Sequence, residues 1–422
     1  MNYTSLLEWH TAHKEQALYG RYLTINKLEP ILDCLPDLFV KERLGYSVQN
    51  RPIYKVTFGT GAIKILGWSQ MHGNESTTTK ALFDLFKWFE AIKDTETGEE
   101  LLSTYSFTFI PMLNPDGAEA YTRVNANQVD LNRDAQELTQ PESLILKQVY
   151  TSLDPDYCLN LHGQRTIFGV GEPAQSAVAS FLSPSQDALR TVTQSRKEGM
   201  AIIAELNEML QEFIPGQVGR YDDGFNINCV GDTLQQLNIP TILFEAGHFP
   251  NDYAREKTRG FMFLSLIRVF ESILLLKSEE NVSSNPYFAI PENKKCFFDC
   301  IIRNINLPEY GVTDMAIQYQ ETLRDGILYF VPKIAQIADL DSFVGHSEID
   351  FAQENHQSPI VDSIIKNAKE LTASYDKIAQ KESFIDALSY INSTEAIKKN
   401  HLGSEVPADT INFDACSKVI SK

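Results

Sequence analysis

The chain has 422 residues, of which 43% are hydrophobic and 10% aromatic, and its formal net charge is −19. The length predicts two or three domains, and this apolar content is typical of a folded globular protein, which excludes general disorder. The acidic balance argues against nucleic acid and anionic membranes as partners, because both bind clustered Lys and Arg side chains.

Three features bear on the cellular compartment. The first residues, Met1 to Arg21, carry scattered charges and lack the uninterrupted apolar core of a signal peptide. The most apolar stretch, Gly260 to Lys277, is interrupted by Arg268 and Glu271, so it predicts a buried helix and not a membrane span. The six cysteines contain no Cys-x-x-Cys pair, which is typical of reduced thiols. We therefore expect a cytoplasmic protein with no membrane partner.

Short β-branched or aromatic runs alternate with amphipathic helical runs from Ile53 to about Lys277. This alternation predicts an α/β fold, with a mixed, largely parallel sheet flanked by helices. One helix is expected after Ser76, which can cap it. The predicted strands are Ile53–Phe58, Ala62–Trp68, Ser106–Met112, Tyr157–Leu161 and Thr241–Phe244, and further helices are predicted over Pro141–Leu153, Lys197–Phe213 and Asp252–Lys277.

A polar break over Ser278–Pro286 indicates a boundary between two parts of the chain. We predict one domain over residues 1–280 and a smaller C-terminal accessory region over 281–422. That region is expected to be β-rich at about 285–350 and helical at about 352–400. Its predicted strands are Cys296–Arg303, Ala316–Gln320 and Gly326–Val331, and its helical stripe is Ile364, Ala368, Leu371 and Tyr375.

Polar residues of catalytic types stand at the carboxyl ends of the predicted strands. His72 lies just past the strand that ends at Trp68, Asn114 and Asp116 follow Met112, His162 follows Leu161, and Glu245 follows Phe244. In an open α/β sheet this edge is where ligands bind, so the four clusters point to one crevice.

His72, Glu75 and His162 supply two imidazoles and one carboxylate. This is a ligand set that holds one Zn²⁺ per chain and leaves a fourth position open, as in catalytic zinc sites. The alternative is that His72 is exposed, Glu75 caps a helix and His162 is a satisfied strand-end histidine. Glu245 emerges from an apolar run, and burial beside a metal would raise its pKa toward the range of a general base; otherwise it is an ordinary strand-end Glu.

The segment Asp130-Leu131-Asn132-Arg133 places a carboxylate, an amide and a guanidinium within four residues. Asn132 and Arg133 can bind a substrate carboxylate through several hydrogen bonds, while Asp130 can orient a ligand imidazole.

With these residues in place, the sequence resembles the zinc carboxypeptidase family of the carboxypeptidase A type, over roughly Val40 to Lys277. The resemblance rests on these motifs in this order: Leu44-Gly45-Tyr46-Ser47, Arg51-Pro52-Ile53, His72-Gly73-Asn74-Glu75, Asn114-Pro115-Asp116-Gly117, Arg123, Asp130-Leu131-Asn132-Arg133, His162 and Glu245.

The resemblance implies a role for each matching residue. His72, Glu75 and His162 correspond to the zinc ligands, and Glu245 to the base that takes a proton from water. Arg123 corresponds to the arginine that polarises the scissile carbonyl. Asn132 and Arg133 correspond to the clamp on the substrate's terminal carboxylate, and Asp130 to the partner of a ligand histidine.

The sequence departs from the family pattern at Gly163, where many members have Ser, and at a tyrosine position. The family's substrate-capping tyrosine should precede Glu245 by about twenty residues, and the nearby candidate is Tyr221, at a spacing that is close but not matched. Beside it, Asp222-Asp223-Gly224 could form a mobile lid, or Tyr221 could be a packed turn residue.

The leading hypothesis is a zinc metallocarboxypeptidase that acts on a peptide or small amide with a free carboxylate. A second hypothesis is a cytoplasmic amidase of the same fold that acts on a murein peptide or an N-acyl amino acid. A third, of another class, is a catalytically silent binding module, which predicts that a ligand or the base is missing; the sequence lacks none of them.

Overall fold

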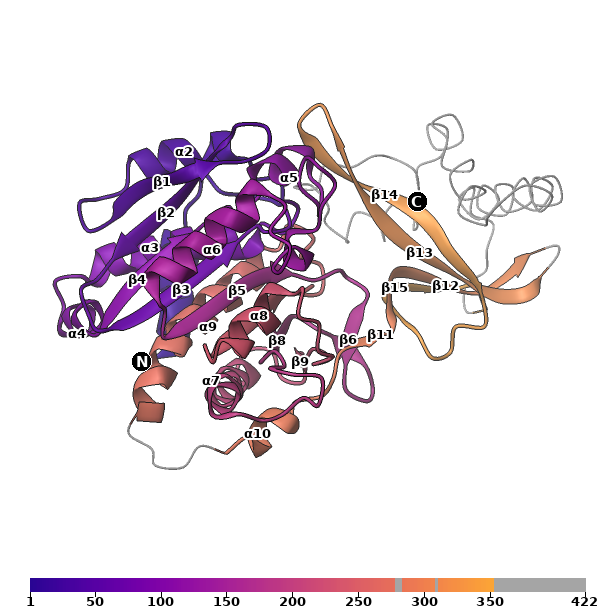
Figure 1. Ribbon diagram of the computed structural model, residues 1–422. Coiled ribbons are helices and arrows are strands. Elements are labelled where there is room, and N and C mark those ends of the chain that lie inside the picture. The colour runs from indigo at the N-terminus through magenta and orange to yellow at the C-terminus, as the bar shows by residue number, and fades with distance from the viewer. Residues whose placement is uncertain (278–282, 308–309, 353–422) are drawn as a thin grey trace. The chain divides into compact units, whose positions relative to one another are not determined.

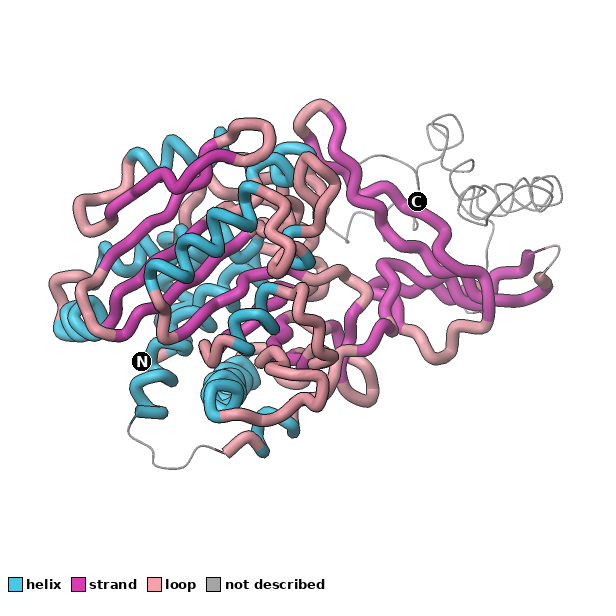
Figure 2. The backbone as a smooth tube through the Cα atoms, viewed as in Figure 1, coloured by secondary structure: helices cyan, strands magenta, loops and turns pink. Residues whose placement is uncertain are grey.

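The computed structural model describes residues 1–277, 283–307 and 310–352. These residues divide into two compact units (Figures 1 and 2). The first holds Met1–Arg165 and Gly169–Lys294, and the second holds Thr166–Phe168 and the described residues from Lys295 onward. The helical stretch predicted at about 352–400, with Ile364, Ala368, Leu371 and Tyr375, lies outside the described residues after its first position.

The first unit is built on an eight-stranded mixed sheet. The strands β4, β3, β5 and β10 at its centre run parallel to one another, and the pairs β1–β2, β2–β4 and β10–β8 are antiparallel. In spatial order the strands are β1 (Val40–Tyr46), β2 (Pro52–Phe58), β4 (Tyr105–Ile110), β3 (Ile63–Ser69), β5 (Tyr157–Gly163), β10 (Thr241–Ala246), β8 (Ala179–Leu182) and β9 (Val218–Arg220).

Helices cover both faces of this sheet (Figure 1). The predicted fold class, a mixed and largely parallel sheet flanked by helices, is therefore confirmed. The helix at Pro141–Leu153 has the predicted bounds, because a proline suits the first helical position and Asp154 ends the helix in the left-handed region. The helices are α1 (Tyr3–His13), α2 (Ile25–Asp33), α3 (Thr77–Ile92), α4 (Glu96–Thr104), α5 (Pro115–Ala120), α6 (Pro141–Leu153), α7 (Gln194–Gln211), α8 (Val230–Gln236), α9 (Glu256–Lys277), α10 (Asn285–Phe288) and the short 3₁₀ helix η1 (Leu131–Arg133).

Alternation along the central strands builds a core on each face of the sheet. Neighbouring strand residues point to opposite faces, so Ile65 joins one hydrophobic cluster and Leu66 the other, as Leu159 and Cys158 also do. The larger cluster includes buried residues of α3, α7 and α9, and the smaller one includes those of α6 and α8. Buried on both faces, these strands meet solvent chiefly at their ends, which is where the polar residues stand.

The second unit contains a four-stranded sheet in the order β14-β13-β12-β15. A tight turn at Asp325 and Gly326, both with positive φ, joins its two longest paired strands. The predicted β-rich character of this region is confirmed. Its strands are β12 (Phe297–Leu307), β13 (Gly311–Arg324), β14 (Ile327–Ala338) and β15 (Val344–Asp350), and three short strands elsewhere are β6 (Phe168–Val170), β7 (Gln175–Ser176) and β11 (Lys294–Lys295).

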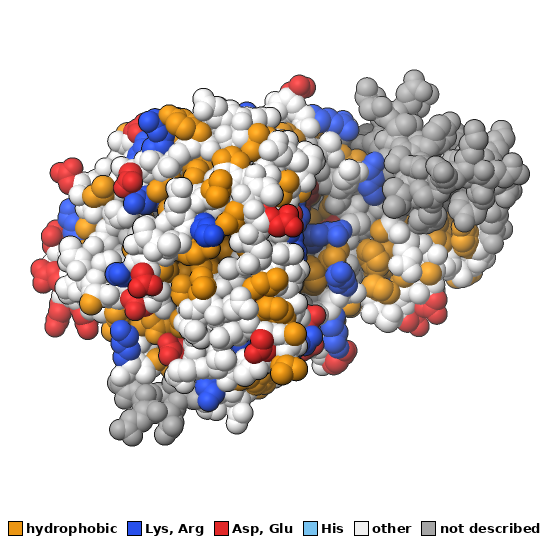
Figure 3. Space-filling model, viewed as in Figure 1, with side chains coloured by type: hydrophobic (Ala, Val, Ile, Leu, Met, Phe, Trp, Pro, Cys, Tyr) orange, Lys and Arg blue, Asp and Glu red, His pale blue; other side chains and the backbone are white. Residues whose placement is uncertain are grey.

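The polar break in the sequence is not where the structure divides. The described residues between the break and Lys294, including α10, belong to the first unit, whereas the boundary was predicted at residue 280. Asp and Glu side chains are interspersed with Lys and Arg side chains over the visible face (Figure 3). Among the described residues, no helix is long and apolar enough to cross a membrane.

Candidate functional site

The loop after β3 carries His72 and is held by close backbone packing. Gly73 lies against α5, and a Cβ atom at this position would come within 1.9 Å of the Gly117 carbonyl carbon, so only glycine fits. The side-chain amide of Asn114 donates to the Met71 carbonyl over 3.1 Å, and the Asn114 backbone N–H donates to the Gln70 carbonyl over 3.0 Å. The loop is thereby fixed to the end of the neighbouring strand.

Asp116 explains why the two earlier motifs accompany the site. Its carboxylate accepts hydrogen bonds from Ser47 Oγ at 2.7 Å, from the Gln49 backbone N–H at 2.9 Å and from Arg51 Nη1 at 2.7 Å. These bonds tie the β1–β2 turn to the start of α5. Ser47, Arg51 and Asp116, which match the family motifs, therefore hold the framework on which the site is built.

The three predicted zinc ligands come together in the structure. His72 Nδ1 lies 3.0 Å from Glu75 Oε1, His162 Nδ1 lies 3.0 Å from Glu75 Oε2, and the two Nδ1 atoms are 3.0 Å apart. Both imidazoles are buried, with 2% of each side chain exposed. Two nitrogens and a carboxylate that converge at this spacing, from the loop after β3 and from β5, can share a single metal ion.

The protonation of the ligand triad reflects the local charges. Burial alone would lower the pKa of His72, but Glu75 and Asp130 raise it to about 9. Burial lowers the pKa of His162. Burial would raise the pKa of Glu75, yet the two histidines hold it well below its ordinary value. Without a metal, His72 is therefore protonated and carries a positive charge between the carboxylates of Glu75 and Asp130.

The donor set and its charge both fit a divalent cation. Among the described residues, the carboxyl groups of Glu75, Asp130 and Glu245 outnumber the permanent cations that act on them, Arg123 and Arg255. Fully ionised, these five groups carry a net charge of −1, so the site has negative charge that a divalent cation would offset. Imidazole nitrogens and carboxylate oxygens are also ligands that zinc takes in proteins.

Glu245 lies beside the triad without a polar partner for one of its oxygens. It pairs in register with His162 across the parallel strands β5 and β10, which brings its carboxyl group to the same edge. Its Oε2 atom is buried and makes no hydrogen bond. Burial first, and then the charge of Glu75, raise the pKa of Glu245 well above its ordinary value. A carboxyl group in this state is poised to exchange a proton.

Arg123 and Asp130 contact the triad from a different side. Asp130 Oδ1 lies 3.1 Å from His72 Nε2, the ring nitrogen that the triad does not use, and so leaves Nδ1 free to act as a ligand. Arg123 Nε donates to Asp130 Oδ2 over 3.0 Å, and Arg123 Nη1 lies 3.4 Å from Glu75 Oε1. The guanidinium is 47% exposed, so one side of it faces solvent and a substrate can reach it.

Asn132 and Arg133 lie in η1, directly after Asp130. Asn132 Oδ1 accepts a hydrogen bond from the Val230 backbone N–H over 3.1 Å, which joins η1 to the start of α8. Arg133 is exposed, and its charge lowers the pKa of both Cys229 and Asp232 against the larger effect of burial. Asn132 is thus linked to the triad through Asp130, whose Oδ1 atom accepts from the Asn132 backbone N–H over 2.9 Å, and the Arg133 side chain is exposed beside it.

Tyr221 follows β9 and lies near the same carboxylates. Burial raises the pKa of its phenol, the charges of Glu245 and Glu75 raise it further, and Arg123 and a hydrogen bond with Asn293 lower it. The Tyr221 backbone N–H donates to the Phe181 carbonyl over 3.0 Å. The structure thus brings Tyr221 to the predicted site as a mostly buried residue.

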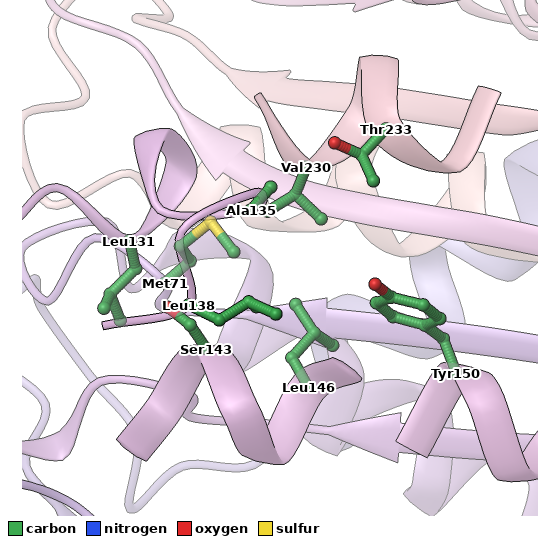
Figure 4. A pocket seen from close by; sticks show the side chains of 9 residues that line it. All are labelled: Met71, Leu131, Ala135, Leu138, Ser143, Leu146, Tyr150, Val230 and Thr233. Carbon is green, nitrogen blue, oxygen red and sulfur yellow. The ribbon is translucent and has the colours of Figure 1, made fainter. Parts of the chain in front are cut away.

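An apolar hollow lies behind the loops that carry these residues (Figure 4). It is partly open and includes Met71, which precedes His72, and Leu131, which separates Asp130 from Asn132. Met71 and Leu131 thus contribute apolar side chains to its lining, next in sequence to the polar residues His72, Asp130 and Asn132. The full lining is Met71, Leu131, Ala135, Leu138, Ser143, Leu146, Tyr150, Val230 and Thr233.

Residues 26–183 match the model of the zinc carboxypeptidase family. The matched region contains His72, Glu75, Arg123 and His162, and Glu245 lies beyond it. No curated protein sequence matches the chain. The resemblance to zinc carboxypeptidases predicted from the sequence is confirmed.

Solved structures of carboxypeptidases are similar to the chain. Thrombin activatable fibrinolysis inhibitor is 14% identical, with 65% of this chain and 81% of that chain covered and a TM-score of 0.50. A metallo-carboxypeptidase from Burkholderia cenocepacia is 17% identical over 60% of this chain and 69% of its own, with a TM-score of 0.49. Carboxypeptidase A from Helicoverpa armigera is 15% identical over 66% and 80%, with a TM-score of 0.48. At 14% identity and a TM-score of 0.50, the similarity to thrombin activatable fibrinolysis inhibitor shows a shared fold alone.

Sequence reasoning missed one residue of this neighbourhood. Asn293 hydrogen-bonds to Gln164, which follows β5, and to Ser180, which pairs with Glu245 of β10. It lies past the predicted boundary at residue 280. Only its position in the polar stretch before β11 distinguishes it, and no periodic pattern marks it.

Proposed function

We propose that this chain, whose residues 26–183 belong to the zinc carboxypeptidase family, is a zinc-dependent hydrolase that removes the C-terminal residue of a peptide. One observation carries the proposal. The Nδ1 atoms of His72 and His162 lie 3.0 Å apart and each lies 3.0 Å from one oxygen of Glu75, beside a buried Glu245 oxygen that has no hydrogen-bond partner.

The triad would hold the ion and Asp130 would orient His72. A zinc ion bound there would supply Lewis acidity, which makes a carbonyl carbon more electrophilic and a water molecule more acidic. Glu245 then removes a proton from the attacking water. Because its environment favours the protonated carboxyl group, it can return this proton to the leaving nitrogen.

Arg123 and the clamp residues act on the substrate. The half-exposed guanidinium of Arg123 stabilises the negative charge that develops on the carbonyl oxygen, and fixed donors of this kind are worth about a hundredfold to a thousandfold in rate. Arg133, also exposed, pairs with the terminal carboxylate, and Asn132 positions it. This pairing restricts cleavage to the last peptide bond.

The activity is placed in the cytoplasm in this proposal, because Cys34, Cys158 and Cys229 are free thiols. The substrate is a peptide or small amide with a free carboxylate, with neither nucleic acid nor membrane as a partner. Of the predicted accessory region 281–422, the part that follows Lys294 is assigned an accessory role.

The test combines metal analysis with a hydrolysis screen. The purified protein should contain about one zinc per chain and should release amino acids from peptides with free carboxyl ends faster than from the same peptides with amidated ends. Equal rates on both would contradict the clamp. Preference for a murein tripeptide or an N-acyl amino acid would favour the amidase hypothesis, and zinc without any hydrolysis would favour a silent binding module.

A further inference from the structure

The segment that follows α10 returns to the edge of the main sheet beside Tyr221. The Arg220 backbone N–H donates to the Pro291 carbonyl over 2.8 Å, and the Asn293 backbone N–H donates to the Arg220 carbonyl over 2.9 Å. Arg220 and Glu292 form a parallel bridge, and Arg220 Nη2 lies 2.7 Å from Glu292 Oε1. Residues 291–293 therefore act as a short added strand beside Arg220, the residue that precedes Tyr221.

The side chain of Asn293 uses both ends of its amide. Its Oδ1 accepts from Ser180 Oγ over 3.0 Å, and its Nδ2 donates to Gln164 Oε1 over 3.0 Å. Gln164 lies two residues after His162, and Ser180 pairs in register with Glu245. The amide thus connects the strands that carry a predicted zinc ligand and the predicted base.

A glycine makes room for this amide. A Cβ atom at Gly219, on the strand just before Tyr221, would lie 1.9 Å from Asn293 Oδ1 and 3.0 Å from Ser180 Oγ. The side chain of Asn293 therefore fills the space that the absent methyl group leaves. The close approach joins the added strand, β8 and β9 into one packed unit.

The other side of the Tyr221 loop is also held. Arg196 is fully buried and bonds to the Asp223 carboxylate, which Arg190 Nη1 also approaches at 2.9 Å. Ser185 Oγ donates to the Asp223 carbonyl over 2.6 Å. The chain is therefore tied down on both sides of Tyr221, at Arg220 by residues 291–293 and at Asp223 by Arg196 and Ser185.

We propose that Asn293 is a positioning residue that holds the Tyr221 phenol at the substrate side of the site. The inference rests on the proposed function, in which Tyr221 contacts substrate. A phenol that is placed before binding pays no ordering cost when substrate arrives, which favours both affinity and rate. The catalytic unit accordingly needs the chain as far as Asn293.

The first experiment measures the phenol itself and needs no catalytic activity. The full-length protein is treated with tetranitromethane, and nitration of Tyr221 is followed by peptide mass spectrometry. Tyr221 should be nitrated several-fold faster in the Asn293→Ala variant than in the wild type. The matched control is Asn285→Ala, at an exposed position of the same segment, which should behave as wild type. An unchanged rate in Asn293→Ala would overturn the proposal.

Gly219→Ala provides a second route to the same change, because the added methyl group displaces the Asn293 side chain while Asn293 itself is kept. It should reproduce the faster nitration. Asn293→Asp keeps the acceptor for Ser180 and loses the donor to Gln164 and Tyr221, so it should resemble Asn293→Ala. Wild-type nitration in Asn293→Asp would assign the effect to packing alone and contradict the inference.

The second experiment measures coupling with the proposed hydrolase activity. Asn293→Ala and Tyr221→Phe should each lower kcat/KM about five- to tenfold, as loss of one hydrogen bond does, and the double variant should lose little more than either. Additive losses would contradict positioning through Tyr221. If the wild type hydrolyses nothing while Asn293→Ala still exposes Tyr221, the proposed function fails and the positioning role stands.

Discussion

The first unit buries two clusters of charged side chains, and they are built on opposite principles. One of them, which we call the staple cluster, joins α1, α3 and α9 and consists of His10, Lys14, Lys80, Asp84, Glu256 and Arg259. Every carboxylate oxygen in it accepts at least one hydrogen bond. Arg259 donates to both oxygens of Asp84 over 2.6 Å, and His10 Nε2 lies 2.8 Å from Asp84 Oδ2. Glu256 accepts from Lys80 at 2.6 Å and from Lys14 at 2.7 Å.

The site cluster of His72, Glu75, His162, Asp130, Arg123 and Glu245 is incomplete by comparison. It has an excess of carboxylates, and Glu245 Oε2 and His162 Nε2 are buried without a partner. Burying charge costs several kcal/mol per ion unless partners compensate. The staple cluster is complete without a ligand, whereas the unpartnered atoms of the site cluster support the proposed metal site.

The largest expected effect comes from removing a metal ligand. His72→Ala and His162→Ala should lose zinc and lower turnover to background, because two remaining donors hold the ion poorly. Zinc content and peptide hydrolysis are measured, with His13→Ala, at an exposed position on α1, as the control. Full zinc content in either variant would contradict the assignment. Chelation of the wild type should have the same effect, reversed by added zinc.

Next comes the base. Glu245→Gln should keep zinc and lower kcat by about a hundredfold to ten-thousandfold, the usual contribution of general acid–base catalysis. Because the substitution removes a buried carboxyl group that lacks a partner, the unfolding free energy of the metal-free protein should not fall. Glu208→Gln, exposed on α7, is the matched control. Wild-type turnover in Glu245→Gln would end the general-base hypothesis.

The staple cluster should show the reverse behaviour. Asp84→Asn removes the carboxylate that accepts two bonds from the buried Arg259 and leaves Glu256 as its acidic partner, which should lower the unfolding free energy by about 3–5 kcal/mol while kcat of the folded protein stays unchanged. Denaturant unfolding and kinetics are compared on the same preparation. Replacing both partners, as Asp84→Leu with Arg259→Met, should cost less than the single change. A loss of activity without a loss of stability would break the comparison.

Arg123 belongs to the site cluster through its ion pair with Asp130, yet its side chain is half exposed. Arg123→Gln should lower kcat/KM about a hundredfold to a thousandfold, as loss of one oxyanion donor does, with little change in stability. Arg123→Lys should recover only part of the rate, because a single ammonium group lacks the fork of the guanidinium. Full recovery would show that charge alone suffices.

The smallest effect expected concerns acid stability. Although burial opposes it, the neighbouring Lys80 and Arg259 lower the pKa of Glu256 from 4.5 to about 2. A depressed carboxyl pKa contributes stability that is fully present above pH 4.5 and is lost as the pH falls through the folded value. Between these limits the wild type should lose up to about 3 kcal/mol of unfolding free energy, and Glu256→Gln should lose less. Parallel curves would contradict the assignment.

Much of the fold could be predicted because it is written in local patterns. The strands that end near Trp68, Leu161 and Phe244 were expected within one or two residues of their observed ends. The structure extends the last two through His162 and Glu245, because those residues pair with each other across the parallel strands. The strand β15 and the first helices, α1 and α2, were missed, since short or weakly periodic segments depend on tertiary packing for their stability.

The amino-acid sequence by itself determined the kinds of donor and the edge of the sheet on which they stand. The type of side chain and the alternation of strand and helix are local properties of the chain. The sequence predicted that Asp130 orients a ligand histidine, and tertiary structure decided that this histidine is His72. Tertiary structure alone decided that Asp84 and Arg259 complete each other and that Asn293 reaches Gln164 across the predicted boundary. Such contacts join residues far apart in the chain, and only the packing of the whole sheet with its helices brings them within hydrogen-bonding distance.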